Sequence, residues 1–326
     1  MIKVSVIVTI YNAGHNLKRC LESLKLQTLK EIEIIMVLDC PTDGSDVVAC
    51  EYANEDSRFK IIKNKNNQHI GESRNIGIRQ SKGEYITFMD HDDFCDDCML
   101  EELYYQAIEN KSDIVWSIIS KYNESKKKAL KVFVPIFNSS NYKDEIFDYI
   151  LGCGTNNEKK RSLNQCHGVL YRKCVLDKHS VFFGDTRKYL PEDAVFNLRA
   201  LCYSNKVVFL NHSYYFHTYT GNNTASSISY YDWDKWYNNF IVVQGLLKDN
   251  NLYISKEKLF LQYLVRNCNT LFAEYFSHRE ISILIRSLKF AKRDLMIKHA
   301  YSSYKEIANP IKFRIFNFII RLLILH

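Results

Sequence analysis

Glycine and proline are scarce in this sequence, whose 326 residues include only 11 Gly and 4 Pro. Collagen-like chains and Pro- and Gly-rich disordered chains need far more of both, so these classes are excluded. No internal repeat and no low-complexity tract is present. Hydrophobic residues make up 46% of the chain and charged residues 25%, with 22 Tyr and 19 Phe. We therefore expect one large globular domain, or one domain with an appendage, built around an aromatic-rich core.

An organised cysteine framework is also lacking, although the chain contains ten Cys. Met1 is followed directly by a strand-like apolar segment and not by a signal peptide, so we expect reduced thiols and a cytoplasmic location. Cys95 and Cys98 form a CxxC pair, but no second pair follows at zinc-finger spacing. The sequence therefore favours a structural role for this pair over a metal or redox site.

Positive charge is unevenly distributed along the chain. The net charge is +7, and residues 252–326 alone contain 13 Lys or Arg against 5 Asp or Glu. The rest of the chain is close to neutral. A positive excess confined to one end indicates contact with an anionic partner, such as the surface of the inner membrane or a phosphate-bearing acceptor.

The C-terminal segment 310–326 is apolar but is interrupted by Lys312, Arg314 and Arg321. It is too short and too charged to span a bilayer. Two interpretations stay open. The segment lies in the membrane interface as a peripheral contact on the cytoplasmic face of the inner membrane, or it packs as a terminal helix on the domain or as the contact of a homo-oligomer.

Apolar runs alternate with helical patterns in the first third of the chain, which is typical of a parallel sheet covered by helices. Expected strands span 3–10, 32–38, 59–63, 84–89 and 113–117, and expected helices cover the region around Leu17–Leu24 and residues 45–54, 72–81 and 100–110. Past Tyr230 the pattern is almost wholly helical. We therefore expect an α/β domain over 1–229, with a nucleotide-binding half (1–110) and an acceptor-binding half (111–229), followed by a helical region over 230–326.

Polar residues follow several of the expected strands. Tyr11 and Asn12 end the first strand, Asp39 ends the second, and Asp90 begins an acidic turn after the fourth. Open α/β sheets bind ligands at the carboxyl ends of their strands. We therefore expect these side chains to line one crevice.

The segment FMDHDDF, residues 88–94, places Asp90, Asp92 and Asp93 close together. Carboxylates so near one another repel unless a cation lies among them, and oxygen ligands favour Mn²⁺ or Mg²⁺ over Zn²⁺. Such an ion keeps coordination positions open for the oxygens of a diphosphate. The alternative is that Asp92 or Asp93 caps a helix beginning near Asp96.

Several segments together resemble the family 2 inverting glycosyltransferases of the GT-A type, which include bacterial capsule and lipopolysaccharide sugar transferases. They are SVIVTIYN (5–12), LESLKLQT (21–28) and GESRNIGIRQSKGEYITFMDHDD (71–93). The resemblance is close over the first third and looser to about Tyr219. It implies a mixed, mostly parallel, Rossmann-like sheet flanked by helices, a helical C-terminal extension and metal-dependent sugar transfer.

The resemblance also implies donor-binding roles. Asp39 is expected to bind the uracil ring of a UDP-sugar in a base pocket lined by Thr9, Tyr11 and Asn12, and Arg74 is expected to neutralise donor phosphate. Asp90 and the neighbouring His91 are expected at the nucleotide sugar, with Asp90 also at the metal, and Asp92 as a direct metal ligand. One departure is that the family has two adjacent Asp after the second strand, whereas Leu38 precedes Asp39 here.

A general base is needed to take the proton of the acceptor hydroxyl. Glu192-Asp193 in RKYLPEDAVFNLRAL resembles the family's Glu-Asp motif, which makes Asp193 the expected base. The pair follows Pro191 at an expected helix start. Carboxylates in a first helical turn are favoured by the helix dipole whatever their function, so a structural role stays open.

Histidines downstream complete the set of expected site residues. The resemblance implies that the segment containing His212 and His217 closes over the donor, with His217 as a further metal ligand. His167 and Tyr171 resemble the acceptor-side wall. A histidine between tyrosines is often only a hydrogen-bonded, partly buried residue.

The expected acceptor is a saccharide or lipid-linked saccharide, in bacterial surface polysaccharide or lipooligosaccharide synthesis. Two alternatives stay open: a catalytically silent module that binds nucleotide sugars, and a nucleotidyltransferase, which would favour a Gly-rich loop after the first strand, where IYNAGHN has a single Gly. Nucleic acid is not expected as a partner, because the basic residues lie on Leu- and Ile-rich predicted helices.

Overall fold

The structure, a computed structural model, describes residues 1–125, 127–130, 142–153, 163–219, 231–303 and 311–325. Its contacts divide the chain into two compact units. The first contains residues 1–145, 162–187 and 192–220, and the second contains residues 146–161, 188–191 and 221–326. The predicted boundary after Ser229 falls among residues outside the described part, and it stays a prediction.

A mixed sheet organises the first unit. Its strands lie in the order β3-β2-β1-β4-β8-β6-β9-β5, with β7 beside β6. Strands β1 to β4 pair in parallel, whereas β8 runs antiparallel to both of its neighbours. The strands are β1 (Val4–Ile10), β2 (Ile32–Leu38), β3 (Phe59–Lys63), β4 (Tyr85–Asp90), β5 (Phe94–Cys95), β6 (Ile114–Asn123), β7 (Lys128–Leu130), β8 (Val169–Arg172) and β9 (Val207–Tyr219).

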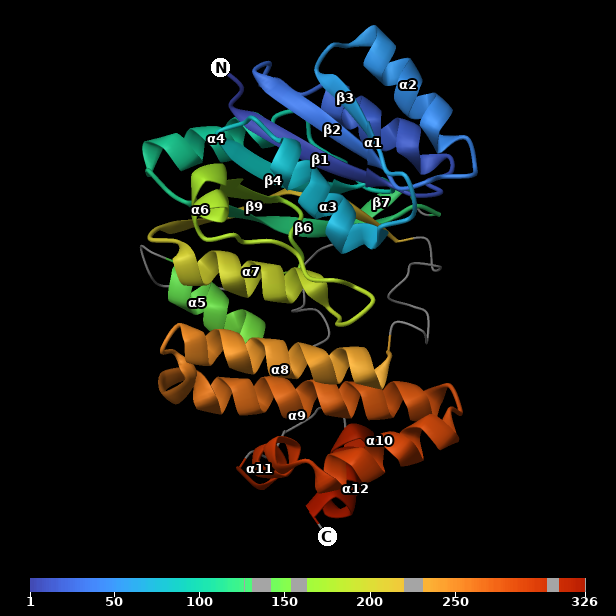
Figure 1. The fold of residues 1–326 in the computed structure, drawn as a ribbon, viewed down its shortest axis with the longest axis vertical. Coiled ribbons are helices and arrows are strands. Elements are labelled where there is room, and N and C mark those ends of the chain that lie inside the picture. The colour runs from blue at the N-terminus through green and yellow to red at the C-terminus, as the bar shows by residue number, and fades with distance from the viewer. Residues whose placement is uncertain (126, 131–141, 154–162, 220–230, 304–310, 326) are drawn as a thin grey trace. The chain divides into compact units, whose positions relative to one another are not determined.

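Helices flank this sheet, and others form the second unit (Figure 1). They are α1 (Asn16–Lys25), α2 (Ser45–Glu55), α3 (His69–Gln80), α4 (Met99–Glu109), α5 (Lys143–Asp148) with the π-helical turn Tyr149–Cys153, α6 (Lys173–Lys178), α7 (Glu192–Tyr203), α8 (Trp233–Asp249), α9 (Tyr253–Ser277), α10 (Ile281–Arg293), α11 (Leu295–Ser303) and α12 (Ile311–Leu325). The predicted α/β fold class with a helical C-terminal region is confirmed.

Strand β1 is buried on both faces, which explains its almost continuous apolar sequence. Val4, Val6 and Val8 belong to a core cluster that also contains Leu17, Leu21 and Leu24 of α1. Ile7 points to the opposite face, where α3 packs. Alternate residues of one strand therefore hold helices on both sides of the sheet.

The close approach of α3 to the sheet depends on Gly77. A Cβ atom at this position would lie 2.4 Å from Cγ2 of Ile7, too close for any real contact. The missing side chain lets the α3 backbone lie against β1. As a result, the earlier turns of α3 reach the ends of the central strands.

Helices of the second unit are joined by buried polar contacts as well as by apolar packing. The Tyr263 hydroxyl of α9 donates to Oδ1 of Asn239 of α8 at 2.7 Å. The Tyr301 hydroxyl of α11 donates to Oδ1 of Asn269 of α9 at 2.6 Å. Across the described parts of the chain, no helix has both the length and the apolar character needed to cross a membrane.

The packing at Gly77 generates a stability prediction. Replacing Gly77 with Ala forces Ile7 to shift, so the free energy of unfolding should fall by about 1–3 kcal/mol. Denaturant unfolding measures this change. Gly245→Ala is the matched control, because nothing lies within 4 Å of the added Cβ in helix α8. Helix propensity predicts that the control keeps or gains stability. Equal losses in the two variants would contradict the proposed clash.

Candidate active site

The polar residues that follow the central strands lie at one edge of the sheet. Thr9 pairs in register with Asp90, and Ile10 pairs with Leu38. The residues after these pairs, among them Asp39, therefore leave the sheet side by side. The polar residues expected at the carboxyl ends of β1, β2 and β4 therefore share one edge of the sheet, where open α/β sheets bind ligands.

Asp39 is almost fully buried, with 3% of its surface exposed. Its Oδ1 accepts hydrogen bonds from Nδ2 of Asn64 and from the backbone N–H of Gln68, both at 2.7 Å. The loops after β1 and β2 are also joined, because Oδ1 of Asn12 accepts from the backbone N–H of Thr42 at 2.8 Å. Hydrogen bonds thus hold the Asp39 carboxylate in place, and the loops after β1 and β2 are joined to each other beside it.

The other residues predicted for the nucleotide pocket lie at the same edge. Thr9 is 7% exposed, and Tyr11 is 49% exposed just after β1. His91 is held by its Nδ1, which donates to the Thr9 carbonyl at 3.0 Å. The ring of His91 is therefore fixed beside the end of β1.

Arg74 is the centre of a buried charge network. Its guanidinium, 2% exposed, donates to Oδ1 of Asp193 at 2.6 Å, to Oδ1 of Asp90 at 3.0 Å and to Oε1 of Glu192 at 3.3 Å. The guanidinium also lies over the Phe183 ring at 5.0 Å. This arrangement joins α3, the end of β4 and the start of α7.

The sequence resemblance gave Arg74 a role at the donor phosphates, whereas the structure gives it three carboxylate partners. It also brings Asp90 and the Glu192-Asp193 pair together on one cation. The two motifs are separated by about a hundred residues in the chain. Helix α7 begins at Glu192, as the sequence predicted.

Charge compensation shifts the pKa values in this network. Burial alone would raise the pKa of Asp90, but His167 and Arg74 lower it well below its usual value. His167 Nε2 lies 3.0 Å from Oδ1 of Asp90, and this contact holds the imidazole pKa above its usual value despite burial. Burial and the neighbouring Asp193 raise the pKa of Glu192 to about 7. The network therefore keeps Asp90 charged while Glu192 is easily protonated.

Asp93 is fully buried and its carboxylate is saturated by hydrogen bonds from β9. Oδ2 accepts from the Tyr215 hydroxyl at 2.6 Å and from Nδ1 of His217 at 3.2 Å, and Oδ1 accepts from the backbone N–H of Thr218 at 2.7 Å. Helix α4 begins only at Met99 and has no side-chain cap. The alternative that an Asp of this turn caps that helix is therefore wrong.

Asp92 has a different environment. Among the described residues, no hydrogen bond reaches its carboxylate, and burial together with Asp93 and Asp90 raises its pKa to about 6. Oxygens of Asp90, Asp92 and Asp93 lie within 4.8 Å of one another. An unpaired carboxylate beside two others is suited to a hard divalent cation.

His217 is oriented as metal-binding histidines usually are. Asp93 fixes its Nδ1, so Nε2 carries the lone pair that a cation would use. The acidic cluster that could hold a divalent ion is Asp90, Asp92 and Asp93. Nε2 of His217 as a further ligand stays a prediction. Asp93 fits the supporting role, because its oxygens are already bonded.

Two weaker expectations require correction. Tyr171 is fully buried, and its hydroxyl donates to Oδ1 of Asn197 at 2.7 Å. His167 is 2% exposed and contacts Asp90. Because neither side chain reaches the surface, neither forms an acceptor wall as the sequence resemblance implied.

Asp93 and Tyr215 are the residues whose importance sequence reasoning missed, together with Cys166, whose Sγ lies 3.5 Å from Oδ1 of Asp193. Asp93 was visible as the third acid of the turn. Its pairing with a tyrosine more than a hundred residues away leaves no local pattern. Cys95 and Cys98 are free thiols in the structure, and the structural role predicted for them stays a prediction.

Comparison with known proteins supplies the family context. The sequence model described as "Glycosyl transferase family 2" matches residues 5–161. Glycosyltransferase GlyA of Streptococcus pneumoniae is 30% identical over 217 residues, 65% of this chain, and the match spans 30% of that protein's length. Cholesterol galactosyltransferase of Borreliella burgdorferi is 28% identical over 309 residues, covering 93% of this chain and 80% of the relative.

A solved structure of Staphylococcus aureus TarS, residues 1–349 in complex with UDP-GlcNAc, has a similar fold. Its TM-score is 0.70 at 21% sequence identity, with 99% of this chain and 88% of that chain covered. At this identity the likeness concerns the fold.

The contrast between Asp92 and Asp93 generates a prediction for protein kept in EDTA at pH 7.5. Asp92→Asn should raise the free energy of unfolding by about 1 kcal/mol, because it removes a charge that the folded state holds poorly. Asp93→Asn should lower it by roughly 1–3 kcal/mol, because it weakens three buried hydrogen bonds. Denaturant unfolding measures both. At pH 3, where both states hold a protonated Asp92, its stabilising effect should vanish. A loss of stability in both variants at pH 7.5 would refute the assignment of separate roles.

Proposed function

Because this chain belongs to glycosyltransferase family 2 and has the GT-A fold, we propose that it transfers a sugar from a nucleotide-sugar donor to an acceptor hydroxyl group. The observation that carries the proposal is the convergence at one sheet edge of Asp39, the unpaired Asp92 and the Arg74-bound Asp193. These are a candidate base-recognition group, a candidate metal ligand and a candidate general base.

The proposed donor is a UDP-sugar. Asp39 would accept a hydrogen bond from the N–H of the uracil ring through Oδ2, while its Oδ1 stays bonded to Asn64 and Gln68. Thr9, Tyr11 and Asn12 would border the same pocket. The fold likeness to a protein solved with UDP-GlcNAc supports a uridine donor. Loss of the first Asp of the family motif leaves Asp39 as the single acid for this contact.

The proposed cofactor is Mn²⁺ or Mg²⁺, held by Asp92, Asp90 and His217. Such an ion, when bound, neutralises the charge that develops on the leaving diphosphate. Asp93 would keep His217 and the acidic turn in place through the bonds to β9. His91, fixed on Thr9, would border the donor on the same side.

The proposed chemistry is a single displacement with inversion. The acceptor oxygen attacks the anomeric carbon, the bond between that carbon and the diphosphate oxygen breaks, and the acceptor proton passes to the carboxylate of Asp193. Arg74 holds Oδ1 of Asp193, and no other described residue bonds to Oδ2, which would take the proton. Arg74 is thus a positioning residue for the base. The same guanidinium also contacts the carboxylate of Glu192.

Two other functions compete with this proposal. A catalytically silent module would bind the nucleotide sugar without breaking it. A nucleotidyltransferase would release pyrophosphate from a nucleoside triphosphate. Two incubations with Mn²⁺ separate the three. With UDP-sugars alone, a transferase slowly hydrolyses its donor to UDP and free sugar. With UTP and a sugar phosphate, only a nucleotidyltransferase releases pyrophosphate. Pyrophosphate release, or binding with no hydrolysis, would contradict sugar transfer.

Replacement of Asp193 with Asn tests the base. The variant should lose at least about a thousandfold in transfer rate, because an amide cannot accept the proton. Affinity for UDP, measured by calorimetry with Mn²⁺, should stay within a factor of a few. Asp177→Asn is the matched control, because Asp177 is an exposed carboxylate paired with Lys173 on α6. Transfer by the Asp193 variant at the rate of the unaltered protein would show that another group is the base.

The acceptor is proposed to be a saccharide or a lipid-linked saccharide of the bacterial cell surface. The Borreliella burgdorferi relative, whose match covers 93% of this chain, is named cholesterol galactosyltransferase. A membrane-lipid acceptor therefore occurs among related proteins. A cytoplasmic location fits nucleotide-sugar chemistry and stays a prediction. The donor sugar and the linkage are open to direct screening.

We also propose that helices α10 and α12 contact an anionic membrane surface. On α12 the exposed side chains Phe318, Ile319, Leu322 and Leu323 form an apolar face, while Ile320 and Ile324 are buried. Helix α10 contains no acidic residue. It exposes a basic set defined as Arg286, Lys289, Lys292 and Arg293. This combination is typical of helices that lie in a membrane interface.

Charge favours a lipid surface over a second copy of the chain. Self-association through this face would bring two positively charged surfaces together, which is unfavourable. A cavity of about 490 Å³ on α10 is lined by Arg286, Lys289, Phe290, Arg293 and Asp294, and three of these side chains are cationic. Anionic headgroups would complement this lining.

Vesicle sedimentation tests the membrane contact. The full chain should bind vesicles containing phosphatidylglycerol and should bind pure phosphatidylcholine vesicles about tenfold less. Lys289→Glu with Arg293→Glu should abolish the preference. The control is Lys82→Glu with Lys178→Glu, which changes the net charge equally at exposed positions of the first unit. Equal losses in the two double variants would mean a non-specific charge effect. A stable dimer without vesicle binding would identify the face as a homo-oligomer contact instead.

A further inference from the structure

Arg19 lies on α1 and reaches the acidic turn from the side opposite Arg74's network. Its Nη2 donates to the backbone carbonyl of Asp92 at 3.0 Å and to Oγ1 of Thr218 at 2.9 Å. The same atom lies 3.1 Å from Oδ1 of Asn16, and Nη1 lies 3.3 Å from Oε1 of Glu124. One guanidinium therefore joins α1, the turn after β4, the end of β9 and the turn after β6.

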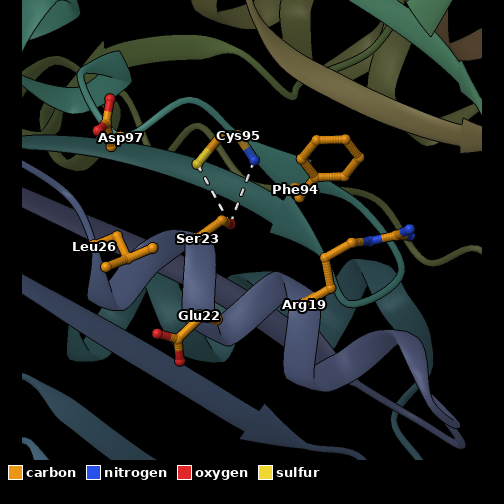
Figure 2. Close-up of a pocket in the computed structure, with 7 residues that line it drawn as sticks. All are labelled: Arg19, Glu22, Ser23, Leu26, Phe94, Cys95 and Asp97. Atoms are coloured by element: carbon orange, nitrogen blue, oxygen red, sulfur yellow. Dashed lines mark hydrogen bonds between the residues drawn. The ribbon is translucent and has the colours of Figure 1, made fainter. Parts of the chain in front are cut away.

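Aromatic rings hold this guanidinium in position. It lies 4.9 Å from the centre of the Phe94 ring and 5.6 Å from that of Tyr122. Phe94 is itself stacked on Phe216 of β9, with ring centres 4.9 Å apart and an interplanar angle of 10°. Figure 2 shows the Arg19 side chain leaving α1 beside the Phe94 ring, at one end of a cavity of about 300 Å³. The two rings therefore pack against the guanidinium.

The contacts of Arg19 and Asp93 act on the same short segment. Asp93 binds the backbone N–H of Thr218 at 2.7 Å, and Arg19 binds the hydroxyl of the same residue. Arg19 also binds the carbonyl of Asp92. The carbonyl of Asp92 is thus linked to Thr218 through Arg19, and the side chain of the next residue, Asp93, binds the same Thr218. The Asp92 carboxylate itself has no hydrogen bond among the described residues. This is the arrangement expected when the backbone is fixed so that the side chain can serve a ligand.

We propose that Arg19 is a positioning residue that holds Asp92 and the end of β9 in the geometry needed to bind the divalent cation and the donor diphosphate. This inference rests on the proposed function and adds a residue that touches neither donor nor acceptor. It assigns to α1 a part in cation binding that the sequence did not indicate.

Positioning Asp92 and the end of β9 requires an arginine and not merely a positive charge. A guanidinium has five N–H donors in a planar fork and stacks on aromatic rings, whereas a lysine ammonium is a compact point charge. A lysine at position 19 would keep the charge near the acidic turn. It would lose the simultaneous bonds to the Asp92 carbonyl, Thr218 and Glu124.

Calorimetric titration of Mn²⁺ into the UDP-loaded full chain tests the inference without relying on turnover. Arg19→Lys should weaken the Mn²⁺ affinity by about tenfold, as is typical when a group that orients a metal ligand is lost. Phe94→Leu should weaken it in the same direction, because the guanidinium loses its stacking partner. Affinity for UDP alone, measured in EDTA, should change little.

Lys18→Ala is the matched control, because Lys18 is an exposed cation at the preceding position of α1, 4.0 Å from Glu51. It should leave the Mn²⁺ affinity unchanged. If Arg19→Lys lowers the melting temperature but keeps the affinity, Arg19 is only structural and the inference is wrong. If the unaltered protein itself binds no Mn²⁺ with UDP, the metal part of the proposed function fails instead.

Discussion

The site depends on one buried cation, the Arg74 guanidinium, which binds carboxylates from two distant parts of the chain. Without it, Asp90, Glu192 and Asp193 would be neighbouring acids in a poorly hydrated place, which is strongly unfavourable. With it, the end of β4 and the start of α7 are held together. The close packing of α3 at Gly77 is what brings the guanidinium to this point. The charge balance of the site thus depends on how closely α3 packs against β1 in the core.

The three acids of the turn after β4 have the same side chain but different environments. Asp93 is buried and saturated by β9, so it is a support. Asp90 is paired with Arg74 and His167, which keeps it ionised. Asp92 has no hydrogen bond among the described residues and a raised pKa. Under the proposed function, the repulsion among these acids would favour binding of a divalent cation, because the cation would relieve it. Arg19 contributes by holding the backbone of Asp92 while leaving its carboxylate unbonded.

Sequence patterns predicted the parallel strands well, since β2 and β3 have the expected bounds and β1 and β4 differ by a residue at their ends. Strands β1, β2 and β4 are buried along almost their whole length, which leaves a clear apolar run. The expected strand 113–117 continues to Asn123, because its polar second half pairs with β9. Motifs supplied the candidate donor-side and base residues, and their roles stay predictions. The pairing of Arg74 with Asp193, of Asp93 with Tyr215 and of Arg19 with Asp92 was not predictable, because long-range contacts between single polar side chains leave no periodic signal.

The central claim is that Asp92 remains unbonded because a divalent ion and a diphosphate occupy the space beside it. A crystal structure of the protein with UDP and Mn²⁺ tests this claim most directly. The account predicts an ion in contact with the Asp92 carboxylate, the uracil ring at Asp39, and Asp93 still bonded to Tyr215. A structure in which UDP is bound elsewhere, or in which the Asp92 carboxylate turns away from an empty crevice, would contradict it.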